Sequence, residues 1–166
     1  MTQISSRASL LHTAIQDLHA GKVDAAKRLP ALADHARDPA LAALLRDEAD
    51  RAKRQAGRLA AAAGTDDPTN LWMEGILEDA ERDTRQTEPG PLLDIALIGA
   101  VRKAKAAEIV SSETAIALAE ALDDETLRTA VGANRAEEIE GDRGLKKLLV
   151  AIVQKTPGTN RFTPAA

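Results

Sequence analysis

The stretch GAVRKAKAAEIVSSETAIAL, Gly99 to Leu118, is rich in alanine, and its apolar residues recur every three to four positions. That spacing is the period of an α-helix with one apolar face. Lys105 and Glu108 nevertheless lie at or beside this face. Because an unpaired charge is expensive to bury, the segment predicts a helix that carries paired charges toward the interior of a bundle.

The same apolar period occurs in three further long segments, which predicts four long helices in all. The first covers about 5–36, the second runs from a cap at Asp38 to Gly64, the third covers about 92–122, and the fourth runs from the DDET stretch at 123–126 to Ile152. Aspartate followed by proline, as at Asp38 and Pro39, favours a helix start.

A shorter amphipathic piece, Leu71 to Gln86, lies between the second and third long segments, and strand signals are absent from the sequence. Two helical hairpins joined by a connection with its own short helix are typical of one bundle topology. The sequence therefore predicts an all-α fold, a ferritin-like up-down four-helix bundle with one crossover that contains a short fifth helix.

The domain organisation follows from length and from the end of the periodic pattern. The chain has 166 residues, the size of about one domain. We expect the bundle to occupy residues 1–155. Proline, glycine and threonine dominate the remainder, so 156–166 are expected to form a flexible C-terminal tail.

Composition argues against several classes of partner. The net charge is −4 and the chain has one Trp, one Phe and no Tyr, so it has neither the basic surface nor the aromatic residues typical of nucleic-acid binding. No apolar run approaches the roughly 18 residues that span a bilayer, and the apolar residues near the N-terminus are too few for a signal sequence. We expect a cytoplasmic protein that binds neither nucleic acid nor membrane.

Polar side chains interrupt the apolar face of every long helix near its middle. The candidates are Lys22 in the first helix, Glu48 and Gln55 in the second, Lys105 and Glu108 in the third, and Asn134, Glu138 and Asp142 in the fourth. One explanation is that each helix is rotated slightly and these side chains reach solvent. The other is that they meet inside the bundle, because buried charges must find one another, a metal or water.

Several short motifs carry a resemblance to a known family. They are KRLPALA at 27–33, QAGRL at 55–59, MEGIL at 73–77, DIALIGAVRKAKAAEI at 94–109 and EEIEGDRGL at 137–145. In this order and spacing the chain resembles the YciE/YciF-like family of bacterial stress-associated ferritin-like proteins, a family of unknown function. The likeness covers about Leu11 to Leu149.

The resemblance implies inward carboxylates like those of di-iron bundles, but several positions have changed. Lys22 stands where the family has a Glu, and Lys105 and Ala106 stand where it has a Glu and a His. In the second helix Glu48 replaces a His and Arg51 replaces a Glu. Gln55, Glu108, Glu137, Glu138 and Asp142 are retained.

The two lysines argue against a tight metal site. An ammonium group does not ligate a metal while it keeps its proton, and it repels a dication in the same cavity. We expect Lys22 and Lys105 to pair with Glu108, Glu138 and Asp142 and to replace the charge of the metal. This interpretation describes a non-enzymatic, stress-associated bundle with a degenerate metal site and no cofactor.

Two alternatives remain open. The first is a metalloprotein that binds one iron or manganese ion, and such a protein could also have oxidase activity. The ligands of the ion would be Glu48, Gln55, Glu108, Glu138 and Asp142. The second is a purely structural protein. In either case the alanine-rich helix faces favour close packing against a second copy, so we expect a homodimer with a further protein partner unidentified.

Overall fold

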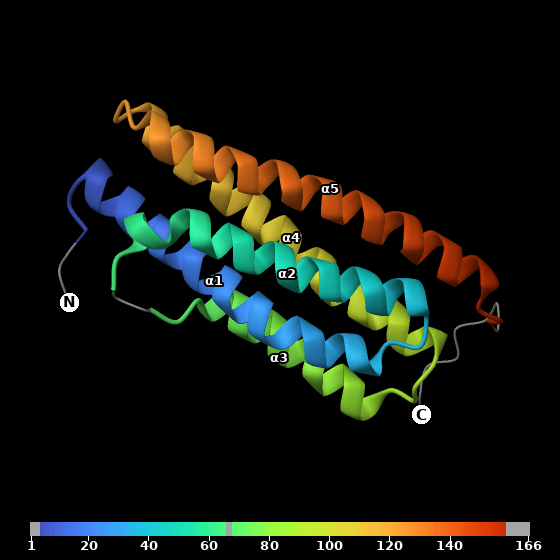
Figure 1. Ribbon diagram of the computed structural model, residues 1–166. Helices are drawn as coiled ribbons and strands as arrows, with labels where there is room; N and C mark the ends of the chain where they lie inside the picture. The colour runs from blue at the N-terminus through green and yellow to red at the C-terminus, as the bar shows by residue number, and fades with distance from the viewer. Residues whose placement is uncertain (1–3, 66–67, 159–166) are drawn as a thin grey trace, which may run out of the picture.

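The computed structural model describes residues 4–65 and 68–158. These residues form five helices and no strand: α1 (Arg7–His35), α2 (Pro39–Ala63), α3 (Leu71–Gln86), α4 (Pro91–Glu120) and α5 (Glu125–Lys155). Helices α1 and α2 form one antiparallel hairpin, and α4 and α5 form the other (Figure 1). The predicted all-α bundle is confirmed.

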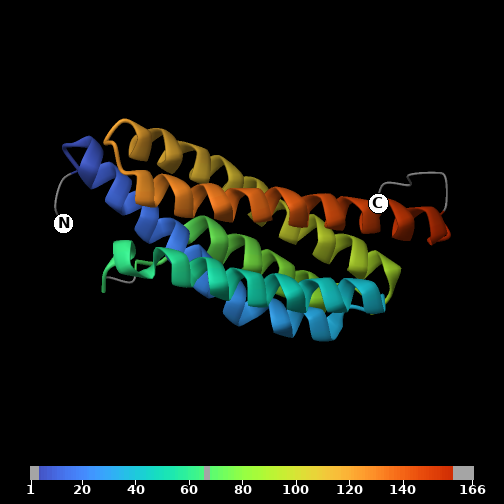
Figure 2. The ribbon, with the colours of Figure 1, turned by 45° about the horizontal axis from the view of Figure 1, so that its top comes forward.

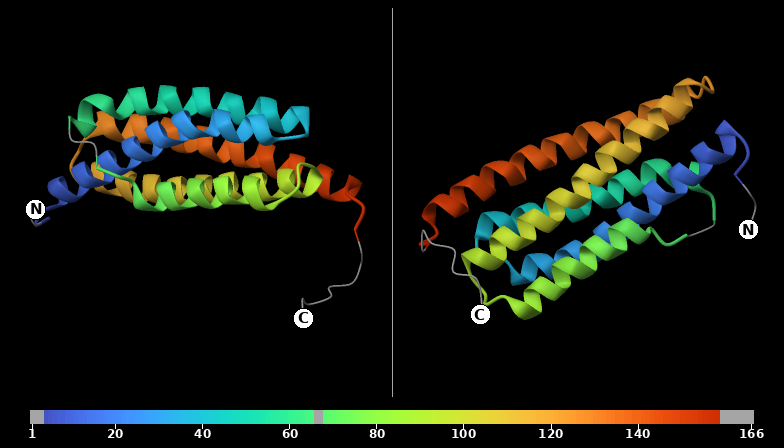
Figure 3. Two further views of the ribbon diagram at one scale, coloured as in Figure 1. Left: turned by 90° about the horizontal axis from the view of Figure 1, so that it is seen from below. Right: turned by 180° about the vertical axis from the view of Figure 1, so that it is seen from behind.

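Helix α3 is the crossover between the two hairpins. It carries the chain back along the bundle, so that α2 and α4 run in the same direction (Figure 1). It packs against α1 and α4, on the side of the bundle that the right panel of Figure 3 shows. Figure 2 shows the two hairpins facing each other across the length of the molecule. This is the topology expected of a ferritin-like bundle with one crossover.

Local sequence explains where the helices begin. Ser6 and Ser9 form a reciprocal capping box at the start of α1. The Asp38 side chain accepts hydrogen bonds from the first turn of α2, with Pro39 as the first helical residue. Asp124 caps α5 in the same way. Side-chain caps therefore mark the starts of α1, α2 and α5, whereas α4 begins at Pro91 without one.

Asn70 fixes α3 onto α1. Its side-chain oxygen accepts a hydrogen bond from the Met73 backbone, and its amide donates to the Asp17 carbonyl oxygen at 2.7 Å. The approach depends on Gly21, since a Cβ at that position would lie 2.9 Å from the Asn70 amide nitrogen. Docked in this way, α3 turns Met73 and Leu77 into the interior at the middle of the bundle.

A second polar anchor lies at the turn between α1 and α2. Asp94, in the first turn of α4, is buried and accepts hydrogen bonds from the backbone N–H groups of Arg37 and Asp38 at 2.8 and 2.9 Å. The carboxylate thereby satisfies the turn between α1 and α2. Local sequence does not predict this role of Asp94, because its partners lie more than fifty positions away along the chain.

The apolar interior consists of two separate clusters. One is built around Leu11, Ile15, Leu18, Leu59, Ala63, Ala115, Ala119 and Val131. The other, larger cluster includes Leu29, Leu32, Leu41, Leu45, Leu77, Leu93, Leu97, Val101 and Leu145. On three of the helices, the buried polar residues between the clusters are Lys22 along α1, Lys105, Glu108 and Ser112 along α4, and Asn134 and Glu138 along α5. A polar layer therefore divides the core at mid-length.

Two further expectations concern membrane-spanning segments and the C-terminal tail. Among the described helices, none has the length and apolar character needed to cross a membrane. Helix α5 ends at Lys155, and residues 159–166 lie outside the described residues. The flexible tail predicted for 156–166 therefore stays a prediction.

Candidate functional site

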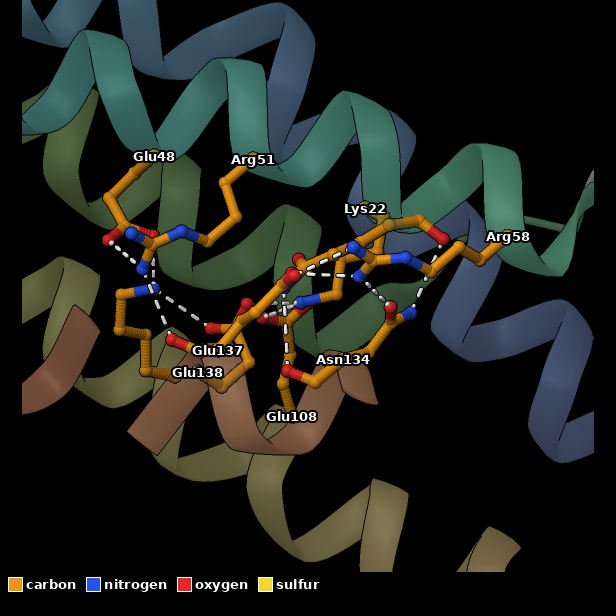
Figure 4. A network of polar contacts seen from close by, with 10 residues as sticks. Lys22, Glu48, Arg51, Arg58, Glu108, Asn134, Glu137 and Glu138 are labelled. Carbon is orange, nitrogen blue, oxygen red and sulfur yellow. Dashed lines mark hydrogen bonds and ion pairs between the residues drawn. The ribbon is translucent and has the colours of Figure 1, made fainter. Parts of the chain in front are cut away.

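Two buried lysines and three buried glutamates meet in the polar layer (Figure 4). The Lys22 ammonium donates to Glu108 Oε2 at 2.6 Å and to Glu138 Oε1 at 2.7 Å. The Lys105 ammonium donates to Glu138 Oε2 at 2.9 Å and to Glu48. All five side chains are at most 5 % exposed. Glu138 thus joins both lysines into a single network.

All four long helices contribute to this network. Lys22 comes from α1, Glu48 from α2, Lys105 and Glu108 from α4, and Glu138 from α5. Three of its four lysine–glutamate ion pairs join one hairpin to the other, and only Lys105 with Glu138 lies within a hairpin. The network therefore ties the α1–α2 hairpin to the α4–α5 hairpin at one longitudinal position.

Gly141 on α5 provides the space that the long side chains need. A Cβ added there would lie 2.5 Å from Glu48 Oε1 and 2.8 Å from the Lys105 ammonium nitrogen. Real Cβ atoms do not tolerate such distances, so any larger residue would displace the Glu48–Lys105 ion pair. The backbone of α5 can approach α2 and α4 at this point only because position 141 has no side chain.

A second set of polar groups extends the network toward the surface between α2 and α5 (Figure 4). Arg51 donates to Glu48 Oε1 at 3.0 Å and to the Glu137 carbonyl oxygen at 3.1 Å. Arg58 holds both carboxylate oxygens of Glu137, at 2.8 and 2.7 Å. The Gln55 amide also donates to Glu137, at 3.0 Å. These groups connect the buried centre to a half-exposed rim.

The charges of the centre balance. The two ammonium groups and the Arg51 guanidinium face the carboxylates of Glu48, Glu108 and Glu138. With every group ionised, the centre carries no net charge. Balance matters because a buried charge without a partner costs several kcal/mol, on the order of the whole stability margin of a small domain.

The two glutamates that contact Lys22 differ in their acidity. Burial raises the pKa of the Glu108 carboxyl to about 7, an effect to which the nearby Glu138 carboxylate adds and which Lys22 only partly offsets. Burial also acts to raise the pKa of Glu138, but Lys22 and Lys105 together outweigh it and lower that pKa to about 2. The difference follows from the number of ammonium groups, since Glu138 contacts two and Glu108 one.

These opposite shifts predict a particular dependence of stability on pH. Between about 4.5 and 7 the folded Glu108 binds more protons than the unfolded one, so its contribution to stability falls as the pH rises. Below about 4.5 the unfolded Glu138 binds more protons, so its contribution falls as the pH drops. We expect Glu108→Gln to flatten the decline above pH 4.5 in urea unfolding and to leave the decline at lower pH. An unchanged profile in the variant would contradict the assignment.

The structure brings some of the predicted site residues together and leaves others outside the network. Lys22, Lys105, Glu108 and Glu138 lie together, and Glu48 joins them through Lys105. Gln55 is buried but lies nearer the rim, where it bonds Glu137 and the backbone of Asn134. The three histidines stand outside the network, with His12 and His35 exposed and His19 half-buried.

The prediction that Asp142 pairs with the lysines is wrong. Asp142 lies 28 % exposed and accepts hydrogen bonds from Arg102 on α4 at 2.7 and 3.3 Å. The reason is the rotation of α5: after Glu138 the next inward position is Gly141, three residues on, and Asp142 follows about 100° further round the helix. Arg102 lies almost one turn before Lys105 on α4 and meets Asp142 at the edge of the interface.

Sequence reasoning also missed two contributors. Glu48 was assigned only to the alternative metal site, yet it accepts a hydrogen bond from Lys105. Gly141 was not considered, although a glycine one turn after an inward Glu138 is the signal that something large lies opposite. Both depend on how α2 faces α4 and α5, which periodicity along one helix does not contain.

The residues of the centre do not fit a bound iron or manganese ion. Of the six carboxylate oxygens of Glu48, Glu108 and Glu138, five accept hydrogen bonds from lysine or arginine. The sixth, Glu108 Oε1, has no hydrogen-bond partner among the described residues. Within residues 4–65 and 68–158, no three or more His, Asp or Glu side chains are grouped so as to hold a metal ion. Two ammonium groups stand among the carboxylates instead.

Comparison with solved structures identifies the fold. The chain is similar to the E. coli stress protein YciF, with a TM-score of 0.87 and 22% sequence identity over 92% of this chain and 100% of that one. It is also similar to YcfI from Rhodopseudomonas palustris, with a TM-score of 0.82 and 21% identity over 87% of this chain and 95% of that one. At these identities the likeness concerns the fold.

Comparison with protein families covers almost the whole molecule. No curated protein matches the sequence. One family, described as a domain of unknown function (DUF892), matches residues 6–157, and the predicted resemblance to the YciF-like proteins is confirmed. The chain therefore belongs to the DUF892 family, and its fold is that of YciF.

Proposed function

We propose that this protein is a non-enzymatic, stress-associated helical bundle in which a lysine–glutamate network takes the place of a metal centre. The observation that carries the proposal is that each of the two buried ammonium groups donates to two carboxylates at mid-length. The fold shared with a bacterial stress protein supports the association with stress. The chain would act by its assembled shape and surface rather than by chemistry at a metal.

The network suits a role in fixing structure better than a role in catalysis. Every carboxylate oxygen but one is already bonded to a cation, so the centre offers few free groups to a substrate. Buried ion pairs contribute little net stability over apolar residues of similar volume, but they penalise arrangements that separate the charges. Here such an arrangement is any sliding of one hairpin along the other, because the pairs between hairpins exist in one register only.

Metal analysis tests this proposal. Protein purified from cells grown with added iron and manganese should contain neither metal in stoichiometric amount. EDTA should leave the melting temperature unchanged, because removal of a ligand lowers stability only where the folded state binds that ligand. Stoichiometric metal, or a fall of several degrees in EDTA, would support the alternative of an iron or manganese protein.

The assembly and location of the protein stay predictions. A homodimer is expected, and light scattering at tens of micromolar chain would test it, with a monomeric mass as the contradicting result. The cytoplasmic location and the absence of nucleic-acid and membrane partners are likewise expectations that follow from the sequence alone.

A further inference from the structure

A small cavity lies at the centre of the bundle, between the lysine–glutamate network and the crossover helix. Its volume is about 20 Å³. The charged side of its wall is formed by the five residues of the network, and the apolar side includes Met73 and Leu77 of α3 together with Ala104 of α4. A cavity of this size accommodates about one water molecule.

Glu108, one of the residues that line the cavity, has a carboxylate oxygen without a hydrogen-bond partner among the described residues. Glu108 is 4 % exposed, and in the described part of the chain no donor lies within hydrogen-bonding distance of its Oε1 atom. A buried carboxylate oxygen that lacks a donor carries a desolvation penalty of about 1–3 kcal/mol or more. While Glu108 is ionised, this atom therefore requires a donor that the side chains around it do not supply.

Lys22 and Lys105 each have an N–H donor that is not used on a glutamate. An ammonium group has three N–H donors, and Lys22 and Lys105 each use two of them on glutamates. Each therefore keeps one N–H that can donate to a further acceptor. Three residues that line the water-sized cavity thus have hydrogen-bonding capacity not used within the network: Glu108 has one carboxylate oxygen without a donor, and Lys22 and Lys105 each have one N–H not used on a glutamate.

The charge balance decides the kind of molecule that fits. A cation would meet two ammonium groups and an anion would meet three carboxylates, whereas the centre as a whole is neutral. We propose that the cavity binds one water molecule, which donates to Glu108 Oε1 and accepts from the remaining N–H groups of Lys22 and Lys105. Water has both donors and lone pairs, so it satisfies all three groups.

A pair of variants of equal shape tests the proposal. Ala104 lines the cavity one helical turn before Glu108, and threonine and valine at that position fill the same volume but differ by a hydroxyl group. If a water serves Glu108, the threonine hydroxyl can replace it and valine cannot. We expect Ala104→Val to melt at least about 5 °C below Ala104→Thr, because it leaves a buried carboxylate oxygen without a donor. The parent separates the two cases: with a bound water its Glu108 already has a donor, so Ala104→Val should melt below the parent, whereas a dry cavity predicts that Ala104→Val melts no lower than the parent and that Ala104→Thr melts above it.

The unaltered protein gives a direct second measurement in case both variants fold poorly. In a crystal structure at high resolution we expect one peak of electron density in the cavity, within hydrogen-bonding distance of Glu108 Oε1. In solution we expect magnetisation transfer from a long-lived water to the Met73 and Leu77 methyl groups. No density and no transfer, or density for an ion, would overturn the proposal. The lysine–glutamate pairs, and with them the proposed function, would be unaffected by that result.

Discussion

Glu138→Gln should be among the most destabilising single substitutions in the molecule, lowering the free energy of unfolding by about 3–5 kcal/mol. Glu138 contacts both buried lysines, so its replacement by a neutral amide leaves two ammonium groups with one carboxylate each. It also leaves the centre with an uncompensated positive charge in an apolar interior. For a chain of this length the expected fall in melting temperature is about 6–20 °C.

The matched control lies two residues away on the same helix. Glu140 is exposed, and Glu140→Gln makes the same chemical change in water, where we expect an effect within about 0.5 kcal/mol. Urea unfolding monitored by circular dichroism measures both variants. Equal stabilities for the two variants would mean that the buried pairs contribute nothing to the fold.

Most of the fold could be predicted from local features of the sequence. Apolar residues at three- and four-residue spacing gave the long helices, and side chains such as Asp38, with the proline after it, marked where one of them begins. The short amphipathic piece between the hairpins is α3. These features are predictable because each depends on residues within one or two turns of one another.

The composition of the buried centre could be predicted only in part. Lys22, Glu108 and Glu138 lie in register with the apolar residues of their helices, so periodicity alone places them inward. Lys105 lies about a third of a turn away from that stripe, but its long side chain still reaches the centre.

The pairing itself depends on the rotation of each helix about its axis. Neighbouring residues such as Gly141 and Asp142 are about 100° apart around the helix axis. The apolar face of a helix is about as wide as this angle, so it does not define which of two neighbouring residues points inward. As a result Asp142 was expected in the network and instead pairs with Arg102. Contacts between α2 and α4, such as Glu48 with Lys105, need the arrangement of two hairpins that are far apart in sequence.

The division of the core into two apolar clusters gives the polar layer a structural consequence. Apolar contacts are not directional, and alanine-rich helices offer few large side chains that interlock. Two such clusters would permit one hairpin to shift along the other. Ion pairs at one level between the clusters resist such a shift, in the way that a single buried polar position fixes register in coiled coils.

Lys22→Glu combined with Lys105→Glu should reverse the electrostatics of the centre. The double variant removes both ammonium groups and adds two carboxylates beside Glu48, Glu108 and Glu138. In chelator we expect it to lose at least about 3 kcal/mol of unfolding free energy at neutral pH, because like charges are buried together. Lower pH should restore part of this loss, since clustered carboxylates share protons and acidic conditions supply them.

Manganese or ferrous iron should restore the double variant in a way that a matched control does not show. The added carboxylates supply oxygen ligands that these ions prefer, and an ion bound to the folded state alone raises the melting temperature with its concentration. The control, Lys22→Met with Lys105→Met, also removes both positive charges but leaves only the carboxylates of Glu48, Glu108 and Glu138, so metal should stabilise it less than it stabilises the glutamate double variant. If instead the glutamate double variant melts in chelator at the temperature of the parent, the lysines do not compensate buried carboxylates. The network would then have no part in holding the two hairpins together.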